Sequence, residues 1–152
     1  MSLKKQHIKL IELILQLIDN AHFLFIHFAI ALFPCSFFLD LISILLKNKS
    51  AEIGSWWCLL LGAFGSIFSI LTGFMADSIY GHMSLPFPIF STHGFVQIIA
   101  SFMFWVLLLW RLKNKNDLPK GKFRKYYIVF EALAVAIFIY GGHLGAILSG
   151  RI

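Results

Sequence analysis

Residues 21–46, AHFLFIHFAIALFPCSFFLDLISILL, form the stretch that decides the fold of this chain. The stretch contains no lysine or arginine and only one acid, Asp40. About 20 apolar residues are enough for an α-helix to cross the hydrocarbon core of a bilayer, so we expect a membrane-spanning helix here. Its two histidines, His22 and His27, need an explanation, because ionisable side chains inside a membrane are costly.

The composition of the whole chain is typical of a membrane protein. Of its 152 residues, 59% are hydrophobic and only 13% are charged, far from the usage of soluble domains. A bilayer can solvate this much apolar surface, and we expect one membrane domain in contact with lipid. The formal charge of +6 does not indicate nucleic-acid binding, because the basic residues cluster between apolar runs, where membrane topology explains them.

Three further apolar runs are long enough to span, at residues 53–76, 87–110 and 126–149. Together with residues 21–46 they predict an all-α fold, an integral membrane four-helix bundle with up-and-down topology. The connector at 111–125 carries seven Lys or Arg, whereas the one at 77–88 carries none. The positive-inside rule therefore places 111–125 on the cytoplasmic side and 77–88 and both termini on the outer side.

The N-terminal segment is too polar to span. Its polar residues recur every three or four positions, at Lys5, Lys9, Glu12, Gln16 and Asp19. This spacing predicts one polar stripe on a helix that lies in the membrane interface. We therefore divide the chain into an N-terminal amphipathic interfacial helix, residues 1–20, and a four-transmembrane-helix bundle, residues 21–152.

The histidines gather at one end of the predicted bundle. His27, His93 and His143 each lie about two turns inside the outer end of a span, roughly 10 Å below the outer edge. His22 and His82 lie shallower on the same side. His22 and His27 point about 140° apart on their helix, so ligands for one centre would come from different spans.

Two kinds of centre suit these residues. Haem b needs two imidazoles on opposite sides of a flat slot, and His27 and His93 lie on diagonal helices of an up-and-down bundle, with His143 beside them. Small residues in the second and fourth spans could line the slot: Gly65, Ser69, Gly73, Gly141, Gly145 and Ser149. Alternatively, His22, His27, His93 and His143 supply ligands for Zn, Cu or Fe. Hydrogen bonding between helices would explain the histidines without a cofactor.

Further polar residues complete the set. Gln97 follows His93 by four residues and so shares its helix face, where it could hold the second nitrogen of a ligand ring. Arg151 follows the fourth span and could approach haem propionates. Asp40 and Glu131 lie near the cytoplasmic end, where they either pair with Lys or Arg from the connectors or form a proton path.

Several motifs resemble a family of bacterial membrane proteins, domain of unknown function 2231. HFLFIHFAIALFP at 22–34 is similar to its HPxxVHFPIAL opening, LTGFMAD at 71–77 to its TG element, and STHGF at 91–95 to the histidine that opens its third span. GGHLG at 141–145 is similar to its closing GGxL element. The resemblance implies four spans in the bacterial inner membrane. Relatives fused to cytochrome c-like domains imply a redox role and a cytochrome c-like partner.

We expect a haem b-binding electron-transfer protein with the haem near the outer, periplasmic face. The alternatives are a transition-metal binding or transport protein that uses the same histidines, and a structural accessory subunit of a larger membrane complex or a homo-oligomer. No constellation typical of a catalytic nucleophile stands out in the sequence, so an electron carrier or subunit is expected rather than an independent enzyme.

Single cysteines introduced by Ser84→Cys and Asn116→Cys test the topology. An impermeant thiol reagent added to intact cells should label position 84 and spare position 116, because the basic connector is expected inside. Opening the cells should expose position 116 to the same reagent. Labelling of position 116 in intact cells would contradict both the orientation and the outer placement of the histidines.

Overall fold

The computed structural model describes residues 3–80 and 93–148, and these form four helices. They are α1 (Leu3–Leu46), α2 (Lys49–Tyr80), α3 (His93–Lys113) and α4 (Lys122–Leu148). The described part of the chain contains no strand. All four helices include a segment long and apolar enough to cross a membrane, namely Asn20–Leu46, Lys49–Met75, His93–Lys113 and Lys122–Ile147. The prediction of an all-α fold with four spans is thus confirmed.

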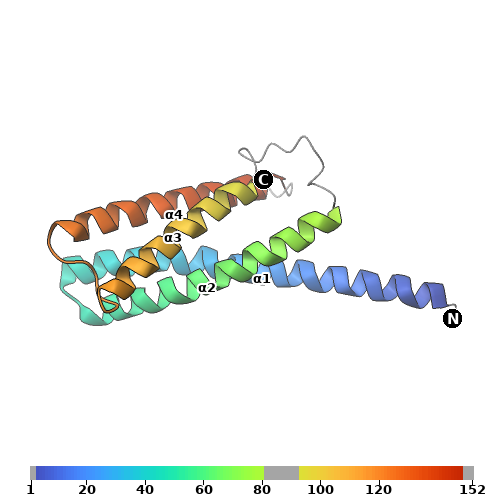
Figure 1. Cartoon of the computed structure of the whole chain (residues 1–152), viewed down its shortest axis with the longest axis horizontal. Helices are drawn as coiled ribbons and strands as arrows, with labels where there is room; N and C mark the ends of the chain where they lie inside the picture. The colour runs from blue at the N-terminus through green and yellow to red at the C-terminus, as the bar shows by residue number, and fades with distance from the viewer. Residues whose placement is uncertain (1–2, 81–92, 149–152) are drawn as a thin grey trace.

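The helices form an up-and-down bundle. Helix α1 packs along α2 and α3 along α4, and contacts of α1 with α4 and of α2 with α3 close the arrangement. Figure 1 shows the α1–α2 and α3–α4 connections together at one end of the bundle. We call this the connection end, defined by residues 47–48 and 114–121. The opposite end, which carries His22, His27, His93 and His143, is called the histidine end.

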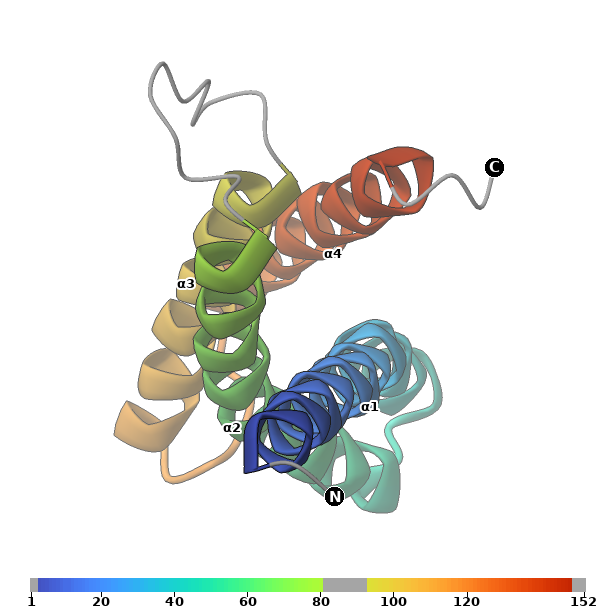
Figure 2. The same cartoon turned by 90° about the vertical axis from the view of Figure 1, so that its right-hand side faces the viewer.

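The N-terminal segment is helical, as predicted, but it is continuous with the first span. Helix α1 runs for 44 residues without interruption, and its N-terminal part projects beyond the other helices (Figure 1). Figure 2 shows the same bundle from the end at which α1 projects. The sequence around residue 20 contains no Gly or Pro to break the helix, so the boundary we placed there does not coincide with a helix end. The interfacial position of this segment stays a prediction.

Short polar turns end the helices at the connection end. Lys47 adopts a left-handed conformation (φ 51°) after α1. The backbone N of Ala51 then donates to the Asn48 side-chain oxygen at 3.2 Å, which satisfies one of the unpaired donors at the start of α2. Lys115, Asn116 and Gly121 adopt similar positive φ angles between α3 and α4.

Three phenylalanines fill the centre of the bundle. Phe33 of α1 stacks on Phe104 of the diagonal helix α3, with ring centroids 3.7 Å apart and an interplanar angle of 4°. Phe138 of α4 meets the Phe33 ring edge-on at 5.2 Å. On α2, Gly62 makes room for Phe33, because a Cβ there would lie 2.9 Å from two ring carbons. Aromatic packing therefore joins all four helices at this level.

The outer surface of the bundle is apolar. Large hydrophobic side chains are exposed on every helix, among them Phe38, Trp57, Phe102, Leu109 and Val129. A soluble monomer rarely exposes so much contiguous apolar surface, whereas lipid tails solvate it. Lipid contact around the bundle follows from this surface.

Gly62→Ala should destabilise the protein by about 1–3 kcal/mol, because the added methyl overlaps a ring that Phe104 prevents from moving away. Gly65→Ala is the matched control, since its nearest side-chain atom, Phe28 Cβ, would lie 3.8 Å from the new methyl. Thermal unfolding in one detergent would compare the two variants. Equal midpoints would contradict the close contact between Gly62 and Phe33.

Candidate functional site

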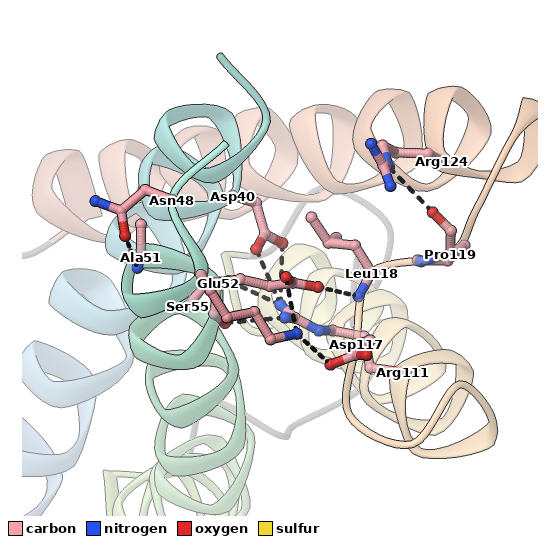
Figure 3. A network of polar contacts seen from close by, with 11 residues as sticks. Asp40, Asn48, Ala51, Glu52, Ser55, Arg111, Asp117, Leu118, Pro119 and Arg124 are labelled. Atoms are coloured by element: carbon pink, nitrogen blue, oxygen red, sulfur yellow. Dashed lines mark hydrogen bonds and ion pairs between the residues drawn. The ribbon is translucent and has the colours of Figure 1, made fainter. Parts of the chain in front are cut away.

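A buried ion pair links diagonal helices near the connection end. Arg111 of α3 and Asp40 of α1 are both completely buried. Arg111 Nη1 donates to Asp40 Oδ1 at 3.0 Å and to Oδ2 at 3.1 Å. Figure 3 shows the two side chains pointing toward each other between the helices. Charge-assisted bonds of this kind are the strong ones, and each charge compensates the other away from water.

Helix α2 supplies further acceptors to the same guanidinium. Arg111 Nη1 donates to Ser55 Oγ at 2.8 Å, and Nη2 donates to the backbone carbonyl of Glu52 at 3.0 Å. The Trp56 ring lies 6.0 Å from the guanidinium carbon, within the usual reach of a cation–π contact. One arginine thus joins α1, α2 and α3.

A second carboxyl group enters the cluster from α4. Glu131 is completely buried, and its Oε1 accepts a hydrogen bond from Ser36 Oγ of α1 at 3.1 Å. Ser36 Oγ also lies 3.2 Å from Ser55 Oγ. Glu131 Oε2 is shielded from solvent and has no hydrogen-bond partner of good geometry among the described residues. The buried Tyr127 lies one turn before Glu131 on the same helix.

A surface layer closes the cluster at the connection end. Lys49 Nζ bonds Glu52 Oε2 at 3.0 Å and Asp117 Oδ1 at 2.6 Å, and Glu52 Oε1 accepts the backbone N–H of Leu118 at 2.7 Å (Figure 3). The hydrogen bond from Lys49 lowers the pKa of the Asp117 carboxyl. These contacts tie the α1–α2 and α3–α4 connections together above the buried ion pair.

The sequence predicted part of this cluster. Pairing of Asp40 with a basic residue of the third connector is confirmed, although Arg111 lies in the last turns of α3. Ser55 and Tyr127 were not singled out. Tyr127 and Glu131 are four residues apart, as are Ser36 and Asp40, and this spacing places each pair on one helix face. Polar residues four apart within apolar runs were the sequence pattern that could have indicated a buried polar cluster.

At the histidine end, two rings lie against glycines of a neighbouring helix. His22 Nδ1 is 3.0 Å from Thr72 Oγ1 of α2, and a Cβ on Gly73 would lie 3.1 Å from His22 Cε1. On the other side of the bundle, a Cβ on Gly145 of α4 would lie 3.4 Å from His93 Cγ. These glycines let imidazole rings approach the α2 and α4 backbones closely.

Gln97 lies on the same face of α3 as His93, as predicted. Its Nε2 donates to the Phe138 carbonyl at 3.1 Å, and a Cβ on Gly141 would lie 3.1 Å from that nitrogen. Gln97 Oε1 is buried and has no hydrogen-bond partner among the described residues. An acceptor without a donor therefore lies one turn along the helix from His93.

The structure does not gather the histidines into a cluster around a metal ion. His27 and His143 are exposed on the bundle surface, and His22 and His93 are half-buried. Within residues 3–80 and 93–148, no three His, Cys, Asp or Glu side chains are placed so that they could hold a metal ion. The predicted site residue Arg151, and also His82 and Ser149, lie outside the described residues.

Packing differs between the two ends of the bundle. Within the described parts of residues 20–28, 67–75, 93–99 and 142–147, no residue is fully buried. Buried residues begin at Ala29, Ser66, Ala100 and Gly141 and continue toward the connection end. All histidines in the described spans therefore lie in the loosely packed part.

This chain belongs to the family described as "Predicted membrane protein (DUF2231)", whose model matches residues 19–152. The resemblance noted in the sequence is thereby confirmed, and the match begins where the first span begins. Neither the curated proteins nor the solved structures contain a significant match. The family description identifies a predicted membrane protein and assigns it no activity.

Arg111→Met should destabilise the bundle by about 3–5 kcal/mol, because it leaves the buried Asp40 carboxylate without its cation. Lys113→Met, the same change at an exposed position of the same helix, should alter stability by less than about 0.5 kcal/mol. Urea or thermal unfolding in detergent would measure both. A small effect of Arg111→Met would show that water reaches the pair.

Proposed function

We propose that this protein is a membrane-embedded electron carrier that binds haem b at the histidine end. The observation that carries the proposal is the coincidence of two properties at one end of the bundle. The outer portions of all four spans contain no fully buried residue among those described, and the same portions contain His22, His27, His93 and His143. A flat apolar cofactor would complete the packing there.

The residues present fit a haem better than a bare metal ion. Haem iron needs only two axial protein ligands because the macrocycle supplies the others, whereas a Zn or Cu site needs three or four converging side chains. No such group of three exists within the described residues. The transition-metal alternative therefore has no support among them, whereas a haem would need only one imidazole from each of two helices.

His27 and His93 are the proposed axial ligands. His93 lies against Gly145, which leaves space for a ring at the α4 backbone. The buried Gln97 Oε1, one turn away, is an acceptor that would hold the second ring nitrogen of His93 and fix its orientation. Bound haem b would supply one-electron transfer between ferric and ferrous iron. His143 and Arg151 stay candidates for contacts at the haem edge.

The location of the haem would define the partner. The positive-inside rule places the histidine end on the outer side of a bacterial inner membrane. Electrons would then pass to or from a periplasmic redox protein, and a cytochrome c-like domain is the partner that we propose. The chain supplies ligands and orientation and is not proposed to act as an independent enzyme.

The absorption spectrum of protein expressed with added haem precursor tests the proposal. Wild type should show a Soret band that shifts on reduction, and His27→Ala or His93→Ala should abolish or convert the low-spin spectrum. His22→Ala is the matched control, because this ring points about 140° away from His27 on the same helix and engages Thr72 of α2.

His143→Ala identifies the second ligand. If that variant loses haem while His93→Ala retains it, the axial pair lies on adjacent helices α1 and α4. A wild-type protein that folds and inserts but contains no haem would refute the proposal. Such a protein would instead fit the role of an accessory subunit that packs against a larger membrane complex.

A further inference from the structure

We infer that Asp40 and Glu131 form a buried proton-binding site at the connection end, that Glu131 carries the proton, and that it exchanges with water on the connection side. This site lies at the opposite end of the bundle from the proposed haem. Its test therefore succeeds or fails independently of haem binding.

The charge balance of the cluster requires a proton. Two carboxyl groups, Asp40 and Glu131, are completely buried, and one guanidinium, Arg111, is buried with them. Hydrogen bonds connect the two carboxyl groups through Ser36, Ser55 and Arg111. One guanidinium balances one carboxylate, and a second ionised carboxylate in the same buried cluster would lack a compensating charge, so one of the two carboxyl groups holds a proton. The cluster then becomes electrically neutral.

The hydrogen-bond partners assign the proton to Glu131. Both oxygens of Asp40 accept hydrogen bonds from Arg111 Nη1, the strongest donor available in the cluster. Glu131 accepts a hydrogen bond only from the neutral hydroxyl group of Ser36. Its Oε2 accepts from no donor among the described residues. The ionised form is therefore stabilised at Asp40 and poorly compensated at Glu131.

Every helix contributes to the surroundings of Glu131. Helix α1 presents Asp40 and Ser36, α3 presents Arg111, and Glu131's own helix presents Tyr127. Helix α2 presents Ser55, which bonds both Ser36 and Arg111. The carboxylate of Glu52 is engaged with Lys49 and the Leu118 amide at the surface, so it does not compete for the buried proton.

A hollow of about 230 Å³ opens at the connection end. Its lining mixes polar side chains, among them Ser43, Asn48, Glu52 and Arg124, with the apolar side chains of Ile44 and Leu118. Ser43 lies one turn beyond Asp40 on α1, and the Glu52 carbonyl accepts Arg111 Nη2. Water in the hollow would therefore be separated from Asp40 by about one helical turn.

Infrared spectroscopy of the purified protein in lipid vesicles tests the site. At neutral pH, wild type should show the carbonyl band of a protonated carboxyl group, and this band should shift when H₂O is replaced by D₂O. Glu131→Gln should remove it. Glu52→Gln, the same change at the surface of the cluster, should leave it. Identical wild-type and Glu131→Gln spectra would overturn the inference, as would a band that does not shift in D₂O.

A second measurement covers the case in which Glu131→Gln does not fold. Dicyclohexylcarbodiimide modifies protonated carboxyl groups in apolar surroundings, and mass spectrometry of the digested wild-type protein locates the adduct. We expect modification at Glu131, with a rate that falls at high pH, and none at Asp40. Modification of Asp40 alone would place the proton on the wrong residue in our scheme. Absence of any adduct at both residues would refute the site.

Discussion

The need to compensate a buried guanidinium governs how the helices meet at the connection end. Arg111 cannot lie in a hydrocarbon-like interior without a counter-charge and hydrogen-bond acceptors around it. Asp40 of α1 supplies the counter-charge, and Ser55 and the Glu52 carbonyl of α2 accept hydrogen bonds from the terminal nitrogens of Arg111, while its buried Nε has no hydrogen-bond partner among the described residues. Each partner reaches Arg111 only when its helix has the correct rotation about its own axis and the correct register along α3. A four-helix bundle packed only by similar apolar side chains would lack this constraint on register.

The bundle is closely packed at the connection end and loosely packed at the histidine end. Glycines admit different kinds of side chain in the two parts. Near the centre, Gly62 admits the Phe33 ring and helps to close the core. Toward the histidine end, Gly73 and Gly145 admit imidazole rings instead, and no described residue is fully buried there. Gly73 and Gly145 are two of the glycines that the sequence analysis placed along a cofactor slot, and that slot stays a prediction.

The parts of the structure that depend on one helix at a time could be predicted from the sequence. Hydropathy gave the four spans, and helical periodicity placed Gln97 beside His93 and both carboxyl groups near one end. The parts that depend on how helices approach each other could not. Whether Arg111 points inward is decided by Ser55 and Asp40 on other helices. His27 and His143 are exposed because each lies two residues from a buried position, Ala29 and Gly141, and therefore points to the opposite side of its helix. The neighbouring helices decide which side of each span is buried. The continuity of α1 through residue 20 was missed because a change in polarity was taken as a helix boundary.

Stability alone does not explain the buried cluster. Replacing a buried ion pair by well-packed apolar residues often leaves a protein as stable or more so, and this chain uses Leu and Phe freely elsewhere in its core. A single Arg–Asp pair would already be neutral and sufficient to fix the helix register. Glu131 adds a second buried carboxyl group, which the Arg111–Asp40 pair does not require. Ser36 donates a hydrogen bond to this additional group. An additional ionisable group held beside a compensated ion pair has a physical use when it can gain and lose a proton. The excess carboxyl is therefore the feature that separates a proton-binding site from a structural ion pair.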